Sequence, residues 1–234
     1  MAENSQNPHA GHRERLKNRF LETGLDSFHA VNTLELILFF AVPRKDTNPI
    51  AHRLLDHFGS LAGVLDAPVE ELMKIDGITK NAAVLLHLFP QTARQYEISR
   101  TADLKILDTT DKAGRYLLPR YTGERSEVVY LLCLDAKCRV LDCRLLFRGG
   151  FSSAAASVRK IIETALAVNA YAVILSHNHT SGIAQPSMED EQTTRALEQA
   201  LHAVDILLVD HIIVADGDYF SMADAGFFKQ EAIV

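Results

Sequence analysis

Residues 170 to 201 read AYAVILSHNHTSGIAQPSMEDEQTTRALEQAL. This stretch begins with an apolar run, which ends abruptly at Ser176-His177-Asn178-His179. The change is typical of a buried strand that runs out into a polar loop. Because side chains alternate along a strand, His177 and His179 are predicted to project from the same face. Two imidazoles one strand repeat apart can converge on one metal ion.

A helix is predicted directly after this polar loop. Ser187 is a favourable N-cap residue, and it places Asp190 at the third position of the first turn, facing back toward the loop. Two neutral nitrogens and one carboxylate leave a fourth tetrahedral position open for water, which is the arrangement of catalytic zinc. The alternative interpretation is that Ser187 and Asp190 form only a helix cap, and that His177 and His179 are solvated surface residues.

Length and composition are those of a globular protein with one large domain or two small ones. The chain has 234 residues, of which 47% are hydrophobic and 23% charged, and its formal net charge is −6. This acidic balance lacks the basic footprint expected of a general nucleic-acid-binding protein. Three cysteines without a C-x-x-C pair are predicted to be packed thiols in a reducing compartment.

The sequence also indicates where in the cell the protein is expected. The polar N-terminal residues lack the apolar core of a signal peptide. No apolar run reaches the ~18 residues needed to span a membrane, so no membrane partner is expected. We therefore expect a cytoplasmic protein.

Two domains are predicted, with the boundary near residue 102. Residues 1–101 read as a cluster of short helices that are punctuated by prolines and glycines. After the boundary the periodicity changes, and runs of apolar and β-branched residues are interleaved with helical patterns. Residues 102–234 are therefore predicted to form a layered, mixed α/β domain.

Two features of the N-terminal domain bear on DNA binding. Residues 75–83, IDGITKNAA, resemble a helix-hairpin-helix turn, but Thr79 stands where a second glycine is usual and would crowd the approach to a phosphate. Residues 11–20, GHRERLKNRF, are the most basic stretch, and they could contact phosphates or form an ordinary solvated helix face. We expect a structural helix pair here and keep DNA as a candidate partner of this domain.

The string H-x-H, seven residues, S-x-x-D resembles the signature of JAMM (MPN+) metalloproteases. Residues 176–187, SHNHTSGIAQPS, are more narrowly similar to RadC family proteins, and residues 11–28 and 42–61 resemble their N-terminal half. The resemblance implies a small all-α N-terminal domain followed by a JAMM/MPN-like (cytidine-deaminase-like) α/β domain with a mixed sheet. It also implies Zn²⁺ as cofactor, with the ligands His177, His179 and Asp190.

The resemblance also assigns catalytic roles. The family pattern places a general-base glutamate at the start of a strand of the form E-x-apolar-x-Leu-Leu, and Glu127 in EVVYLLCL matches it. Glu163, which precedes the histidine-bearing strand, is the alternative. Ser187 matches the serine that helps stabilise the oxyanion of the tetrahedral intermediate. His211 also fits the RadC pattern, either as a partner of the metal ligands or as a packed strand histidine.

Three hypotheses for the function follow. The first is a zinc metallohydrolase of the JAMM type, in which metal-activated water attacks an amide, peptide or isopeptide bond of a protein or peptide substrate. The second is a DNA-associated repair or recombination factor, or a metal-dependent nuclease, because activated water also attacks phosphate. The third is a non-catalytic MPN-type scaffold, against which the intact ligand set argues.

Overall fold

The computed structural model of the chain describes residues 11–43, 45–101, 103–149 and 154–228. The chain divides into two compact units, Met1–Ala93 and Arg94–Val234. The domain boundary predicted near residue 102 stays a prediction, because residue 102 itself lies outside the described residues.

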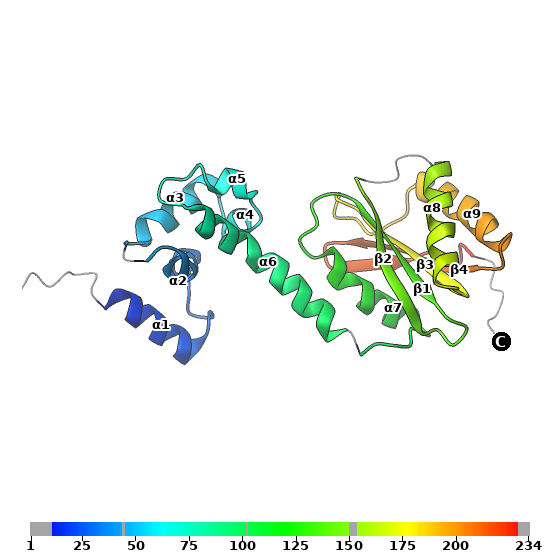
Figure 1. The fold of residues 1–234 in the computed structure, drawn as a ribbon, viewed down its shortest axis with the longest axis horizontal. Helices are drawn as coiled ribbons and strands as arrows, with labels where there is room; N and C mark the ends of the chain where they lie inside the picture. Colours follow the sequence, from blue (N-terminus) through cyan, green and yellow to red (C-terminus); the bar gives the residue numbers. More distant parts are fainter. Residues whose placement is uncertain (1–10, 44, 102, 150–153, 229–234) are drawn as a thin grey trace, which may run out of the picture. The chain divides into compact units, whose positions relative to one another are not determined.

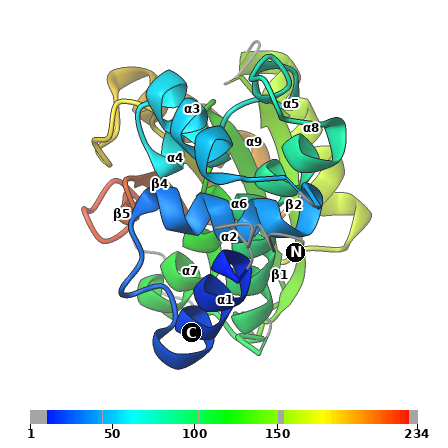
Figure 2. The ribbon, with the colours of Figure 1, turned by 90° about the vertical axis from the view of Figure 1, so that its left-hand side faces the viewer.

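The first unit is helical, as predicted (Figures 1 and 2). Six consecutive residues of its second helix, 34–39, are buried. Leu34, Ile37 and Leu38 belong to the main core of this unit, whereas Leu36 and Phe39 pack with Leu16 of the first helix in a smaller cluster. Pro49 lies in the first turn of the next helix, and Gly59, with φ of +80°, closes it. The helices are α1 His12–Thr23, α2 Ala30–Ala41, α3 Asn48–Phe58, α4 Leu61–Leu65, α5 Val69–Leu72 and α6 Lys80–Arg100, of which the part from Arg94 onward belongs to the second unit.

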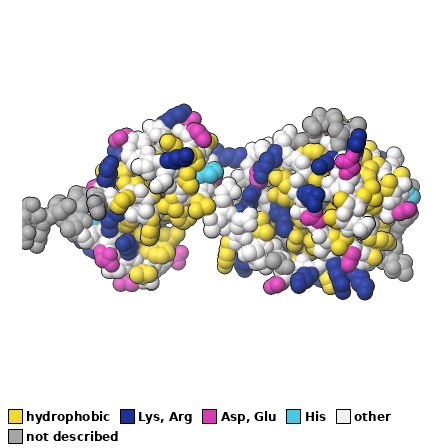
Figure 3. All heavy atoms as spheres, viewed as in Figure 1, with side chains coloured by type: hydrophobic (Ala, Val, Ile, Leu, Met, Phe, Trp, Pro, Cys, Tyr) yellow, Lys and Arg dark blue, Asp and Glu magenta, His cyan; other side chains and the backbone are white. Residues whose placement is uncertain are grey.

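The basic stretch of α1 is bonded into the first unit. Arg13 donates hydrogen bonds to the backbone oxygens of Phe39, Val42 and Lys45 at 2.6–3.2 Å, and so caps the C-terminal end of α2. Arg19 donates to Asn32 Oδ1 at 2.9 Å. On the face drawn in Figure 3, the Lys and Arg side chains of this unit are scattered among hydrophobic and acidic ones.

The turn before α6 also has a structural explanation. Gly77 has φ of +92°, and a Cβ there would lie 2.9 Å from Cδ1 of Ile50. Thr79 Oγ1 accepts a hydrogen bond from the backbone N–H of Ala82 at 3.3 Å, so this side chain satisfies an amide at the start of α6.

Helix α6 is longer than its apolar spacing indicates. It continues through Pro90 to Arg100, although the apolar periodicity thins after residue 90. Most residues of this last part are exposed or only partly buried. A helix that faces solvent needs no apolar spacing. The apolar periodicity therefore ends near residue 90 although the helix continues.

The second unit contains a five-stranded sheet in the order β2-β1-β3-β4-β5. Only β3 and β4 are parallel, and the other neighbours are antiparallel, so the sheet is mixed as predicted. The elements are α7 Thr110–Leu117, a 3₁₀ helix Leu118–Tyr121, β1 Val128–Leu134, β2 Val140–Arg148, α8 Ala154–Ala167, β3 Ala172–Asn178, α9 Met188–His202, β4 Leu207–Ala215 and β5 Asp218–Ser221.

Helices cover both faces of this sheet (Figure 1). In β1, Val128 and Leu132 pack with α7 on one face, whereas Val129 and Leu131 pack with α8 and α9 on the other. This is the alternation expected of a strand in the middle of a layered fold. β3 lies at the centre of the sheet and is buried along its whole length, which matches its uninterrupted apolar run.

The remaining expectations from composition concern the thiols and the membrane. Cys133, Cys138 and Cys143 are free, and burial raises the pKa of the Cys133 thiol to about 12. Cys133 is therefore an inert, packed thiol. Within the described ranges of the chain, no helix has the length and apolar character required to cross a membrane.

Candidate metal centre

The two histidines of the H-x-H string lie at the end of the central strand. His177 is on the face of β3 that α8 and α9 cover, and His179 follows the last strand residue. The backbone N–H of His179 donates to the carbonyl of Val214 in β4 at 2.8 Å, which holds the chain in an extended course beyond β3. The Nε2 atoms of the two rings are 3.0 Å apart. The prediction that both side chains share one side is confirmed.

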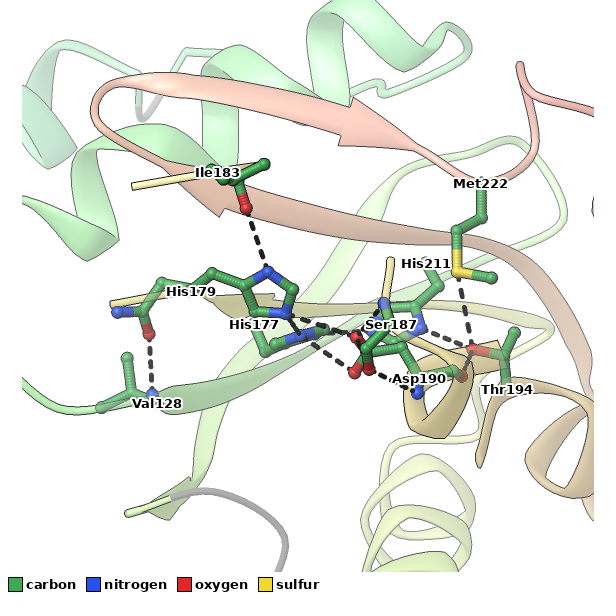
Figure 4. Close-up of polar contacts among 10 residues, drawn as sticks. Val128, His177, His179, Ile183, Ser187, Asp190, Thr194, His211 and Met222 are labelled. Atoms are coloured by element: carbon green, nitrogen blue, oxygen red, sulfur yellow. Dashed lines mark hydrogen bonds and ion pairs between the residues drawn. The ribbon is translucent and has the colours of Figure 1, made fainter. Parts of the chain in front are cut away.

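Asn178, between the histidines, projects from the opposite face and anchors the strand end. Its Oδ1 accepts from the backbone N–H of Val128 at 2.7 Å, and its Nδ2 donates to the carbonyl of Ser126 at 3.1 Å (Figure 4). These bonds join the end of β3 to the start of β1. The position of both imidazoles is therefore fixed by the sheet itself.

The carboxylate comes from the first turn of α9, where Ser187 and Asp190 form the predicted cap. The backbone N–H of Asp190 donates to Ser187 Oγ at 3.1 Å, and the backbone N–H of Ser187 donates to Asp190 Oδ2 at 2.8 Å. The hydroxyl of Ser187 also donates to Oδ2 at 2.6 Å. This reciprocal arrangement holds the carboxylate back toward the loop, as the capping-box pattern predicts.

The three side chains converge on one point (Figure 4). Asp190 Oδ1 is 3.2 Å from His177 Nε2, and Oδ2 is 3.3 Å from His179 Nε2. One ligand atom of each residue lies within 4.8 Å of the others. Burial raises the pKa of Asp190, but hydrogen bonds with His177 and Ser187 outweigh that effect and hold the pKa below its ordinary value. Asp190 is therefore an anion at neutral pH.

The hydrogen bond of His179 decides which of its nitrogens can bind a cation. Its Nδ1 lies 3.0 Å from the carbonyl oxygen of Ile183. A carbonyl only accepts, so Nδ1 carries a proton and Nε2 is the ring nitrogen that can bind a cation. An imidazole lone pair beside a second imidazole nitrogen and an anionic oxygen is a donor set that suits a divalent cation such as Zn²⁺. The residues present fit the implied metal.

A cavity of about 480 Å³ and another of about 430 Å³ meet at His179 and Thr180. The second contains the His-His-Asp group and Ser187, and Glu127 lines it as well. Glu127 is the residue directly before β1, two residues ahead of Val129. Val129 pairs in register with His177. By strand alternation, the side chain of Glu127 lies on the same face as His177.

The alternative glutamate lies elsewhere. Glu163 is exposed on α8, where its Oε1 accepts from Arg159 Nε at 2.8 Å, and it is not among the residues that line the cavity. The structure thus brings Glu127 to the His-His-Asp group and leaves Glu163 in a solvent-exposed ion pair.

His211 contacts His177, and Thr194 contacts His211 in turn. His211 in β4 is fully buried, and its Nε2 is 2.8 Å from His177 Nδ1. Burial lowers the pKa of His211 well below its ordinary value, so the ring is neutral. Thr194, whose Oγ1 is 2.6 Å from His211 Nδ1, was missed by the sequence analysis. It lies four residues after Asp190 on α9, and that helical spacing was the available signal.

A family model described as a RadC-like JAB domain matches residues 107–227. The chain belongs to the RadC family. The matched RadC segment contains every strand of the sheet, helices α7 to α9 and the His-His-Asp group. The resemblance inferred from the motif is confirmed, and so is the mixed α/β fold that it implied. A RadC-like JAB domain assigns the second unit to the JAMM type of metal-dependent hydrolase domains.

Proposed function

We propose that this RadC family protein is a zinc-dependent hydrolase that cleaves an amide, peptide or isopeptide bond in a protein or peptide substrate. One observation carries the proposal, namely the convergence of two imidazoles and a carboxylate within 4.8 Å beside an open cavity. His177, His179 and Asp190 would hold the cation. When bound, Zn²⁺ supplies Lewis acidity, which polarises a carbonyl group and lowers the pKa of water.

Glu127 is the proposed general base. Glu127 lines the cavity that contains the proposed ligand set, where its carboxylate could take a proton from water and deliver it to the leaving amine. Its backbone carbonyl accepts from the N–H of Gly149 at 2.7 Å, which fixes this segment at the cavity wall. The exposed side chain remains free to turn between water and leaving group.

Ser187 is the proposed oxyanion donor. Its hydroxyl donates to Asp190 Oδ2 at 2.6 Å, and turning this donor toward a developing oxyanion would stabilise the transition state by roughly 3 kcal/mol. The backbone N–H of Ser187 also donates to Oδ2, at 2.8 Å. Asp190 therefore keeps one hydrogen bond from Ser187 when the hydroxyl turns away.

The alternative functions have less support. Arg13 and Arg19 donate their hydrogen bonds within the first unit, and Thr79 caps α6, so these features do not favour DNA as a partner. A non-catalytic scaffold would not require the convergence of the ligand set. We propose a cytoplasmic location, which the free cysteines support.

The function is tested with a library of quenched fluorescent peptides and isopeptide-linked peptides, assayed with zinc or with a chelator. We expect the wild-type protein to cleave a subset of these in a zinc-dependent manner. Glu127→Gln should lower turnover by roughly 100-fold or more while zinc content stays unchanged. The matched control is Glu163→Gln, which should retain full turnover. Cleavage of DNA or RNA by the zinc-loaded protein, without peptide cleavage, would favour the nuclease alternative.

A further inference from the structure

We infer that the cavity of about 480 Å³, which we call the α7-side cavity, binds a bulky apolar side chain of the substrate. Leu118 and Val214 in its floor are the residues that determine this specificity. The inference rests on the proposed function and deepens it, because it names the substrate class as a polypeptide with a residue such as Leu or Phe near the scissile bond. The volume lies within the range of roughly 300–1,000 Å³ that is typical of ligand pockets.

The α7-side cavity and the cavity of the His-His-Asp group lie at the same end of the sheet but on opposite faces. Helix α7 covers one face, and α8 and α9 cover the other (Figure 1). Asn178 and Val214, whose side chains project to the α7 face, line the first cavity only. His179 and Thr180, which follow the last residue of β3, line both cavities. The two cavities therefore join over the end of β3.

This connection fits an extended polypeptide. A chain that lies across the end of β3 would have its scissile bond beside the His-His-Asp group and a neighbouring side chain in the α7-side cavity. Successive side chains of an extended chain are about 3.3 Å apart along its axis and point to alternate sides. Neighbouring residues of one substrate can therefore reach cavities that lie on opposite faces of the sheet.

The floor of the α7-side cavity is apolar. Val214 and Tyr121 are buried members of the core beneath α7, and Leu118 packs against the same core while it stays partly exposed. The hydroxyl of Tyr121 donates to Ser176 Oγ at 2.7 Å, so this polar group is already bonded inside the protein. The floor therefore offers aliphatic and aromatic surface, which favours an apolar side chain because contact releases water from both.

The charged groups at the rim of the cavity do not select a charged side chain. The carboxylate of Glu124 accepts hydrogen bonds from Arg148, at 2.6 and 3.2 Å, and from Arg94. Arg125 and Asp216 add one charge of each sign. Three arginines thus stand against two carboxylates, and this small excess of positive charge is spread over an exposed rim. The apolar floor therefore decides which side chain is bound.

The test measures peptide binding and needs no cleavage. The probes are fluorescein-labelled alanine-glycine peptides with blocked ends, which differ only at one central position that carries Leu, Phe, Ala, Glu or Lys. They are titrated into zinc-treated Glu127→Gln protein, which lacks the proposed base and so leaves the peptides intact. Fluorescence polarisation gives Kd. The Leu and Phe peptides should bind about 10-fold more tightly than the Ala, Glu and Lys peptides.

In the same protein, Leu118→Ala should weaken binding of the Leu peptide by about 5-fold, and it should favour Phe over Leu because the floor becomes wider. The matched control is Leu145→Ala. Leu145 packs against the same core but is not among the described residues that line the α7-side cavity. Leu145→Ala should leave each Kd within about 2-fold of its value without this substitution.

A second readout locates the bound side chain. Methyl ¹H–¹³C spectra should show shifts at Leu118 and Val214 when the Leu peptide is added, and much smaller shifts with the Glu peptide. Equal binding of the Leu, Glu and Lys peptides, no binding of any of them, or equal effects of Leu118→Ala and Leu145→Ala would overturn the inference. Selective binding of the apolar peptides without zinc-dependent cleavage by wild type would refute only the proposed hydrolase.

Discussion

At the scale of single residues, Asp190 has two kinds of contact. Its carboxylate faces both imidazoles at 3.2 and 3.3 Å, and it also accepts from the backbone N–H and the hydroxyl of Ser187. The proposed metal ligand and the helix cap are therefore the same side chain. A substitution here is expected to affect both the proposed metal site and the start of α9.

Asp190→Ala should lose bound zinc and also lower the stability of the metal-free protein by about 1 kcal/mol, because the cap is lost. Zinc content and urea unfolding in the presence of a chelator measure the two effects separately. His179→Ala is the matched comparison, since His179 takes no part in the cap. It should lose zinc with less destabilisation of the metal-free protein.

Ser187→Ala removes the hydroxyl but keeps the backbone N–H that binds Asp190 Oδ2. On the substrate that the library identifies, turnover should fall by roughly 100-fold, while zinc content changes little. Turnover at saturating substrate and zinc per chain are the two measurements. If Ser187→Ala lost zinc as completely as Asp190→Ala, Ser187 would belong to metal binding and not to oxyanion stabilisation.

At the scale of elements, the loop between β3 and α9 has a backbone constraint. Gly182 has φ of +81°, and a Cβ there would lie 2.9 Å from Asp216 Oδ2 in the turn between β4 and β5. The same loop places the Ile183 carbonyl against His179. The conformation of this short segment therefore helps to hold the His179 ring in place.

Gly182→Ala should destabilise the protein by about 1–2 kcal/mol and should weaken zinc binding, because the loop must shift. Gly217→Ala is the control for backbone strain alone, since Gly217 has φ of +79° but its Cβ would meet no atom within 4 Å. Urea denaturation and chelator competition compare the two variants. Equal zinc affinity in both would contradict the role assigned to the loop.

Sequence patterns were informative where a local rule determines geometry. Strand alternation placed His177 and His179 on one face, and the cap pattern placed Asp190 beside them, because both rules act within a few residues. Thr194 and His211, 17 residues apart, meet only because α9 packs on β4, and no local pattern encodes that packing. The extension of α6 beyond Pro90 was likewise hidden, since its exposed residues carry no apolar period.

At the scale of the whole second unit, Glu124 links separate parts of the chain. It accepts from Arg148 at the end of β2, at 2.6 and 3.2 Å, and from Arg94 in α6. Burial raises the pKa of Glu124, but the hydrogen bonds and charges of Arg148 and Arg94 outweigh it, so the pKa lies below its ordinary value of 4.5. Its contribution to stability is therefore complete above that ordinary value and disappears as the pH falls through the lowered pKa.

Glu124→Gln should lower the free energy of unfolding by about 1 kcal/mol at neutral pH, because two charged donors lose their anionic partner. The difference from wild type should shrink as the pH falls below 4.5. Urea denaturation at a series of pH values measures this. Glu163→Gln, in the exposed pair with Arg159, should change stability less at every pH. A difference for Glu124→Gln that grew on acidification would contradict the assigned sign.

The proposed function depends on whether the His-His-Asp group binds metal in the folded protein. The most direct measurement is elemental mass spectrometry of the purified chain, wild type beside His179→Ala, with both proteins shown to be folded by circular dichroism. We predict about one zinc per wild-type chain and none in the variant. A folded wild-type protein that contains no metal, even after reconstitution with zinc, would contradict the account.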